Sequence, residues 1–148
     1  MPRFFRRIRE GVFDVPDLKA RAVELGEFVD WAKKKHSFEA TRLGAVGFSN
    51  GANIGSGLAL LRPDLLRDLV LLRPMMPFVP DPLPDLGRLS VFIAQGTRDP
   101  TVPSGQTDEL AELLRRAGAK VTVHRSEAGH GLVPEDYQAA TAWLREKR

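Results

Sequence analysis

The sequence predicts an α/β fold with a mostly parallel sheet flanked by helices. Short apolar segments alternate with longer segments whose apolar residues recur at helical spacing, and this alternation is typical of βα units. The short apolar segments lack polar alternation, as in strands that are covered on both faces. With 148 residues, 43% of them hydrophobic and 28% charged, the chain is expected to form a single domain over residues 1–148 with a core of its own.

The first half of the chain is expected to fold as helix, strand and helix. Residues 15–35 predict an amphipathic helix because their apolar residues recur at helical spacing. Residues 43–48 are apolar and show no alternation, so they predict a strand that is buried on both faces. A helix of small residues follows from about residue 50 to residue 61, where the pair Arg62-Pro63 ends it.

Two further buried strands are expected at residues 68–72 and 91–95. Between them, residues 73–88 contain five prolines, which exclude a regular helix or an inner strand. The large apolar side chains of this segment either line a pocket for an acyl or aromatic group or simply cover the sheet. They are Met75, Met76 and Phe78.

The second half of the chain repeats the alternation of helix and strand. Residues 103–117 predict an amphipathic helix that ends at Gly118, and residues 120–125 predict a fourth strand. Residues 134–146 predict the last helix. Its packed stripe is expected to consist of Tyr137, Ala140, Trp143 and Leu144.

The composition excludes several kinds of site. The chain has no cysteine, so a disulfide scaffold, a zinc ribbon and a thiol nucleophile are excluded. It has neither a phosphate-binding Gly-Lys-Ser/Thr motif nor a histidine pair at ligand spacing, so we expect no cofactor and no metal. No apolar run approaches the ~18 residues of a membrane span. Because no signal peptide is visible either, we expect a cytoplasmic protein without a membrane partner.

The net charge of +3 is concentrated near the start of the chain. Lysines at 33–35 end the first predicted helix, where cations interact favourably with the helix dipole. No aromatic residues are interleaved with them as a stacking platform, so we expect no nucleic-acid partner. The remaining basic cluster consists of Arg3, Arg6, Arg7 and Arg9.

A nucleophile is indicated where the strand at 43–48 meets the following helix. Residues 47–51 read Gly-Phe-Ser-Asn-Gly, which matches the Gly-x-Ser-x-Gly pattern of a sharp strand-to-helix turn. Glycines at both ends leave room for a strained backbone that lifts the Ser49 hydroxyl above the strand ends. The first N–H groups of the helix then point at a developing oxyanion.

His130 is the favoured base for this serine, which needs a base that is oriented by an acid. His36 ends a lysine-rich helix and is expected to be solvated, whereas His124 lies in a strand between apolar residues and is expected to face a polar surface. His130 lies between two glycines, after the last strand and before the last helix. Flexible glycines there let the imidazole reach across the strand ends.

Asp99 is the favoured acid, because it follows the strand at 91–95 closely and a strand end fixes an imidazole better than a loop does. Ligands bind outside the carboxyl ends of parallel strands, so the chosen serine, aspartate and histidine all fall on one edge of the sheet. The rival acids are Asp81, Asp85 and Glu127.

Three motifs together resemble those of a known superfamily. They are Gly-Phe-Ser-Asn-Gly at 47–51, Gly-Thr-Arg-Asp-Pro-Thr-Val-Pro at 96–103 and Gly-His-Gly at 129–131. In this set and in the chain order Ser, Asp, His, the sequence is similar to the α/β-hydrolase superfamily. Within it, the chain resembles the small carboxylesterases and phospholipase-type serine hydrolases, close to the dienelactone-hydrolase-like esterases.

The resemblance implies an α/β-hydrolase fold and roles at the matching positions. Ser49 is expected to be the nucleophile, and His130 the general base and then the general acid. Asp99 is expected to orient His130 and stabilise its cation, and the backbone N–H of Asn50 to be one oxyanion donor. The implied function is hydrolysis of a small-molecule carboxylic ester through an acyl-enzyme on Ser49.

The chain departs from this family in the region before residue 15. Members begin with further strands and take a second oxyanion donor from a His-Gly loop, whereas a short basic arm precedes the helix at 15–35 here. We therefore expect an N-terminally truncated domain, the C-terminal two-thirds of the fold, about 60 residues short of the ~200 of a small member. The loss of one oxyanion donor costs about 10²–10³ in rate, so impaired activity is expected.

Truncation would also leave the strand at 43–48 as an open apolar edge, and such an edge predicts a homodimer that forms through it. Two other functions stay open on the sequence alone. One is a non-catalytic remnant of the fold that acts as a binding or dimerisation module. The other is an acyltransferase that uses the same three side chains but passes the acyl group to an acceptor other than water.

Overall fold

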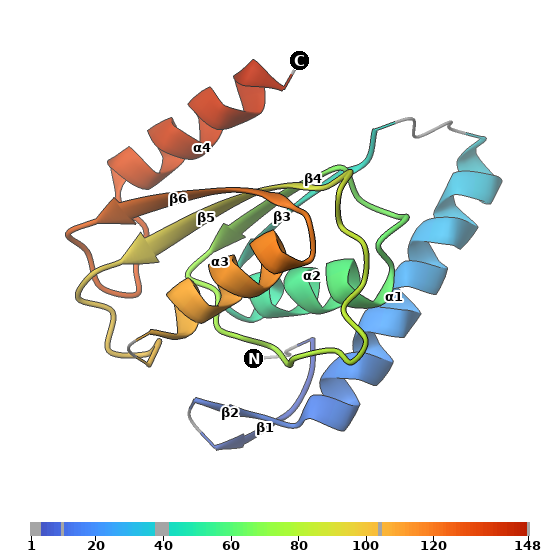
Figure 1. Cartoon of the computed structure of the whole chain (residues 1–148), viewed down its shortest axis with the longest axis horizontal. Coiled ribbons are helices and arrows are strands. Elements are labelled where there is room, and N and C mark those ends of the chain that lie inside the picture. The colour runs from blue at the N-terminus through green and yellow to red at the C-terminus, as the bar shows by residue number, and fades with distance from the viewer. Residues whose placement is uncertain (1–3, 10, 38–41, 104, 148) are drawn as a thin grey trace.

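The computed structural model describes residues 4–9, 11–37, 42–103 and 105–147 (Figure 1). Four parallel strands form the central sheet in the order β3-β4-β5-β6, and β1 and β2 form a separate antiparallel hairpin. The predicted α/β class with a parallel sheet flanked by helices is confirmed. The elements are β1 (Arg7–Arg9), β2 (Val12–Phe13), α1 (Val15–His36), β3 (Gly44–Phe48), α2 (Asn50–Leu61), β4 (Asp68–Leu72), β5 (Ser90–Gly96), α3 (Gln106–Arg116), β6 (Lys120–Ser126) and α4 (Pro134–Glu146).

Helices cover the two faces of the sheet unequally. Helices α2 and α3 lie on one face with α1 packed against α2, whereas α4 alone lies on the other face, over β5 and β6 (Figure 1). Alternate residues of β4 enter two cores, Leu69 and Leu71 the larger one and Val70 and Leu72 the smaller one around Trp143. β4 therefore lies at the centre of the domain, between the two cores. Burial of each of these side chains contributes about 1.5–3 kcal/mol. Among the described residues, no helix combines the length and the apolar character needed to cross a bilayer.

Three elements have the bounds that the sequence predicts. They are α2 at 50–61, β4 at 68–72 and α4 at 134–146. Helix α3 begins at Gln106 rather than at residue 103, because Gly105 before it has a φ of 84° and so cannot belong to a right-handed helix.

The β1-β2 hairpin was not predicted, since only a basic arm was expected at this end of the chain. Arg7 pairs with Phe13, and Arg9 pairs with Val12. Phe5 and Phe13 are both buried, and their rings meet edge to face with centroids 5.1 Å apart. The two rings join the larger core, which attaches the arm to the rest of the domain.

The prediction that β3 is buried on both faces is wrong. Val46 is 66% exposed and Phe48 44% exposed, while Ala45 and Gly47, which alternate with them, are half-buried on the α2 side. The reason is the position of α4, which covers β5 and β6 and leaves the same face of β3 uncovered. An apolar segment without polar alternation therefore does not by itself show that both faces are covered.

The outer edge of β3 has no strand partner in the described part of the chain, and pairing of a second copy along it stays a prediction. We expect the protein to associate reversibly, with the Val46→Lys variant shifted towards monomer because a lysine on an edge strand disfavours strand pairing. Light scattering across a concentration series measures this. Val79 lies outside the sheet and is also 66% exposed, so Val79→Lys is the matched control. A wild type that stays monomeric at every concentration contradicts the prediction.

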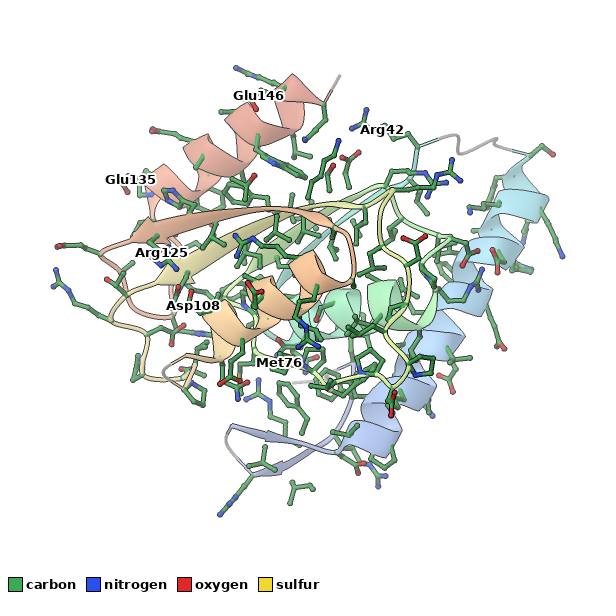
Figure 2. The ribbon with its side chains drawn as sticks, in the orientation of Figure 1. Arg42, Met76, Asp108, Arg125, Glu135 and Glu146 are labelled. Atoms are coloured by element: carbon green, nitrogen blue, oxygen red, sulfur yellow. The ribbon has the colours of Figure 1, made fainter. Side chains whose placement is uncertain are left out.

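The proline-rich segment between β4 and β5 contains neither helix nor strand, as predicted. Met75 and Phe78 are buried in the larger core, and Met76, which is labelled in Figure 2, packs against it. The backbone N–H of Met76 donates to Gln106 Oε1 at 3.0 Å. The three side chains thus belong to the larger core or pack against it, and none of them lines the cavity beside Ser49 described below.

The predicted stripe of α4 is correct only in part. Trp143 is buried and Ala140 packs beside it, but Tyr137 is 57% exposed and Leu144 36% exposed. The buried stripe begins at Asp136, which is 1% exposed. Hydrophobic periodicity assigns such a position to solvent, because a buried carboxylate looks like a surface residue in the sequence.

Candidate active site

Three side chains that follow three different strands meet at the carboxyl edge of the sheet. Ser49 follows β3 directly, Asp99 comes shortly after β5, and His130 comes shortly after β6. His130 Nδ1 lies 2.8 Å from Oδ2 of Asp99, and its Nε2 lies 2.9 Å from Oγ of Ser49. A carboxylate only accepts hydrogen bonds, so we assign the proton to Nδ1, which leaves Nε2 to accept from the serine hydroxyl. The structure thus brings together all three predicted side chains.

The backbone of the turn between β3 and α2 holds Ser49 in an unusual conformation. Its φ of 52° and ψ of −112° lie outside the regions that side-chain-bearing residues commonly adopt, at a cost of about 1–3 kcal/mol. The Ser49 N–H donates to Leu72 O at 2.8 Å, which ties the turn to the end of β4. At Gly47, an added Cβ would lie 2.3 Å from Gly51 O, so only glycine permits this path.

Asn50 is the first residue of α2, so the fold leaves its backbone N–H without an intrahelical partner. The side chain of Asn50 accepts the backbone N–H of Phe4 through Oδ1 at 2.9 Å, which ties the N-terminal arm to the site. Asn50 Nδ2 and Arg7 Nε are buried and have no hydrogen-bond partner among the described residues. These donors give this side of Ser49 a positive potential.

Asp99 is fixed from both of its oxygens. Oδ1 accepts the backbone N–H groups of Thr101 at 2.8 Å and of Val102 at 3.3 Å, and Oδ2 faces His130. The side chain of Asp99 is only 2% exposed. This turn therefore aims one oxygen at the imidazole, as expected of a residue held at a strand end.

The rival acids have other partners or other positions. Asp85 accepts the backbone N–H of Gly87 through Oδ1, and Glu127 forms an exposed ion pair with Arg98. Asp81 lies in the proline-rich segment and is exposed. Of the candidate acids, the structure thus places Asp99 against His130.

The loop that carries His130 is held against the end of β5. Thr97 N–H donates to Ser126 O at 2.9 Å, and Arg98 N–H donates to Ala128 O at 3.0 Å. A Cβ at Gly96 would lie 2.4 Å from Gly129 O, so this close approach requires glycine. These contacts hold the loop of Asp99 and the loop of His130 side by side.

A cavity of about 690 Å³ opens beside Ser49 and His130. Its far wall is apolar, with Leu25 from α1, Ile54 and Leu58 from α2, and Leu69 from β4. Residues of β3 itself line the cavity, and Phe48 packs on the imidazole of His130 with ring centroids 5.3 Å apart. A ligand in this cavity meets mostly hydrocarbon, with the serine hydroxyl at one end.

Arg73 and Asp136 form a buried ion pair behind the His130 loop. Arg73 Nη2 lies 2.6 Å from Asp136 Oδ2, and the two side chains are 0% and 1% exposed. Sequence reasoning missed both residues, since an arginine after a strand and an aspartate in the first turn of a helix look like solvated residues. The one available signal was the position of Arg73 directly after the four apolar residues at 69–72.

His124 lies against the same ion pair rather than at a polar surface, so that expectation is wrong. Its ring stacks on the ring of Phe92 with centroids 6.2 Å apart, and its Nε2 lies 3.5 Å from Asp136 Oδ1. The cause is the pairing of His124 with Ala94 in the sheet, which turns its side chain to the face that α4 covers.

The pKa of Asp136 predicts how stability depends on pH. Burial acts to raise this pKa, but hydrogen bonds from Arg73, from the backbone N–H of Val133 and from Ser126 Oγ outweigh it, so the pKa lies below its ordinary 3.8. A lowered carboxyl pKa stabilises the fold above the unfolded-state pKa, and this stabilisation is lost as the pH falls through the folded-state pKa.

We therefore expect the difference in unfolding free energy between wild type and Asp136→Asn to be largest above about pH 4 and to shrink at lower pH. Urea unfolding at a series of pH values measures it. Arg73 and the neighbouring His124 lie beside the side chain of residue 136 and are present in both proteins, so both groups are common to the comparison. A difference that stays constant down to about pH 2 contradicts the assignment.

No group of three or more histidine, aspartate or glutamate side chains in the described ranges is arranged to hold a metal ion. The arrangement instead offers a hydroxyl, an imidazole and a carboxylate in a hydrogen-bonded series, with helix N–H groups beside the hydroxyl. Such a set can transfer a proton from a serine to a leaving group.

Comparisons with known proteins agree in placing this chain among hydrolases. The sequence model of the dienelactone hydrolase family matches residues 14–146. A protein of Bacillus subtilis (strain 168) with the name "Putative hydrolase MhqD" is 42% identical over 146 residues, which are 99% of this chain and 73% of that protein.

Solved structures show the same similarity. The crystal structure of a Bacillus cereus carboxylesterase superposes with a TM-score of 0.94 at 43% identity, over 99% of this chain and 69% of that one. A carboxylesterase from Mesorhizobium loti gives a TM-score of 0.87 at 32% identity, over 97% of this chain and 68% of that one.

Proposed function

Since the chain belongs to the dienelactone hydrolase family of α/β-hydrolases, we propose that it hydrolyses carboxylic esters through an acyl-enzyme formed on Ser49. The observation that carries the proposal is the hydrogen-bonded series from Asp99 through His130 to Ser49. Support for the ester class comes from the two carboxylesterases, which are 43% and 32% identical to this chain.

The proposed reaction has two halves. In the first, Ser49 Oγ attacks the ester carbonyl carbon while His130 Nε2 takes the hydroxyl proton, and the resulting imidazolium then gives that proton to the departing alcohol. In the second, a water molecule attacks the acyl-enzyme, His130 takes its proton, and the acid leaves as the proton returns to Ser49. Asp99 keeps the imidazole in the required tautomer and stabilises its cation in both halves.

The negative charge that develops on the carbonyl oxygen requires hydrogen-bond donors. We assign one of them to the backbone N–H of Asn50, at the positive end of the α2 dipole. Such a donor contributes about 10²–10³ to the rate, and because it belongs to the backbone, the helix itself holds it in place.

The cavity determines the class of ester. Because its far wall consists of leucine and isoleucine side chains, an uncharged acyl or alkyl group gains most by entering it. We therefore propose small apolar esters as substrates, for which p-nitrophenyl butyrate is a suitable test compound.

Covalent labelling tests the proposal. We expect a fluorophosphonate probe to label the wild type on the peptide that contains Ser49, and Ser49→Ala to abolish both the labelling and the hydrolysis of p-nitrophenyl butyrate. Ser56 lies in α2 and its hydroxyl donates to Asn53 O at 3.0 Å, so Ser56→Ala is the matched control and keeps the label.

A folded wild-type protein that resists the probe would overturn the proposal in favour of a non-catalytic binding module. Labelling on a serine other than Ser49 would also overturn it. Product analysis with an added alcohol distinguishes hydrolysis of the acyl-enzyme from acyl transfer to the alcohol, because a transferase forms the new ester in preference to the free acid.

A further inference from the structure

Arg73 stands directly after β4 and is turned into the interior. Its φ is 56°, in the left-handed region, and its backbone N–H donates to Ala94 O at 2.8 Å, which fixes the turn to β5. The side chain is fully buried, at 0% exposure. Removing a charged side chain from water is costly, and the ion pair and the hydrogen bonds of this guanidinium must offset that cost.

The guanidinium of Arg73 bonds to the peptide carbonyls on both sides of His130. Nε donates to Gly129 O at 3.1 Å, and Nη2 donates to Gly131 O at 3.1 Å. Glycines alone flank His130, so the local backbone has little preference of its own. One planar group thus spans the segment whose conformation decides where the imidazole points.

Asp136 anchors this guanidinium to the start of α4. Its carboxylate accepts from Arg73 Nη1 at 3.4 Å as well as from Nη2, and it also accepts Ser126 Oγ at 2.9 Å and the backbone N–H of Val133 at 3.0 Å. The bonds connect the last residue of β6, the His130 loop and the first turn of α4. These bonds hold the guanidinium between the His130 loop and the start of α4.

The end of β4 holds both partners of the proposed reaction. Leu72 O accepts the N–H of Ser49 at 2.8 Å, while the next residue, Arg73, holds the loop of His130. Two adjacent residues, the last residue of β4 and the one after it, thus help to set the separation of Ser49 Oγ and His130 Nε2. A misplacement of about 1 Å costs roughly 10²-fold in rate.

We propose that Arg73 is a positioning residue for the reaction at Ser49, which acts by clamping the carbonyls of Gly129 and Gly131 so that His130 stays aligned between Asp99 and Ser49. The inference rests on the proposed esterase function. Lysine cannot replace this arginine fully, because an ammonium lacks the fork of donors that reaches two carbonyls and a carboxylate together.

The test compares Arg73→Met with Asp136→Asn. Both variants break the same buried ion pair, but only Arg73→Met removes the donors to Gly129 and Gly131. We expect Arg73→Met to lower kcat for p-nitrophenyl butyrate by about 10²-fold or more with KM changed less than threefold, and Asp136→Asn to lower kcat less than tenfold. Arg73→Lys is expected to recover part of the lost kcat.

A proton NMR signal gives a readout that does not depend on activity. The Nδ1–H of His130 that is shared with Asp99 is expected to give a low-field resonance, identified by its absence in His130→Ala. We expect Arg73→Met to broaden or lose this resonance and Asp136→Asn to retain it. Circular dichroism and thermal unfolding establish that each variant is folded at the temperature of the measurement.

The control for a merely structural arginine lies at the other end of the same strand. Arg42 forms an ion pair with Asp68, the first residue of β4, at 2.5 Å. Figure 2 shows Arg42 far from Met76, which belongs to the proline-rich segment after β4. Arg42→Met is expected to lower thermal stability and leave kcat unchanged.

Equal losses of kcat in Arg73→Met and Asp136→Asn, or a retained resonance in Arg73→Met, overturn the clamp. Hydrolysis that persists in Ser49→Ala instead overturns the proposed function alone.

Discussion

Replacing His130 with alanine is expected to lower kcat for p-nitrophenyl butyrate by about 10⁴–10⁶-fold and to leave KM within about threefold. The imidazole is the group that lies within hydrogen-bond distance of both Ser49 Oγ and Asp99 Oδ2. Without it the serine keeps its proton and the leaving alcohol receives none, so both halves of the reaction slow. Substrate binding depends on the apolar cavity and is largely retained.

Initial rates across a range of ester concentrations measure both constants. His36 is exposed at the end of α1 and serves as the control histidine, since His36→Ala removes an imidazole that lies outside the site. Because loss of the base also slows attack on the fluorophosphonate probe, labelling of His130→Ala should be slow but should still map to Ser49. A His130→Ala variant with more than a tenth of the wild-type kcat would contradict the assigned role.

Replacing Gly47 with alanine is expected to destabilise the protein by about 3 kcal/mol or more and to abolish activity. The added Cβ lies 2.3 Å from Gly51 O and 2.6 Å from Ala52 N, and both contacts are with backbone atoms of the first turn of α2. Either α2 moves away from β3 or the strained turn at Ser49 opens. In both cases the Ser49 hydroxyl loses its hydrogen bond to His130 Nε2.

Urea unfolding and ester hydrolysis on the same preparation measure the two effects. Gly55 in the middle of α2 is the matched control, because a Cβ there meets its nearest neighbour, Leu69 Cδ1, at 3.4 Å. Gly55→Ala is expected to be neutral or stabilising by up to about 1 kcal/mol, since alanine is the better helix former. A Gly47→Ala protein as stable as wild type would show that the turn tolerates a side chain.

The sequence predicts best what short-range patterns determine. The bounds of α2 follow from its small residues and from the Arg62-Pro63 pair, and the position of β4 follows from its apolar run at 69–72. Ser49, Asp99 and His130 were proposed because each follows a strand, and parallel strands bring their carboxyl ends to one edge. The structure brings the three side chains together at that edge.

Contacts between distant segments account for what the sequence did not predict. The exposure of Val46 depends on α4, which lies over β5 and β6 and stops short of β3. Arg73 and Asp136 are 63 residues apart, and neither has a local pattern that distinguishes it from a solvated charge. The hairpin of β1 and β2 has strands of three and two residues, which are too short for any periodicity.

The predicted pairing of two copies along β3 would couple assembly to ligand binding, because Ser49 directly follows that strand. Val46 and Phe48 line the cavity, and both belong to the strand whose outer edge has no partner in the described part of the chain. A strand that paired with this edge would therefore lie beside the cavity. By thermodynamic linkage, a ligand that favours the paired form strengthens pairing by the same factor by which pairing strengthens its binding. For such a ligand, the apparent affinity becomes a function of protein concentration.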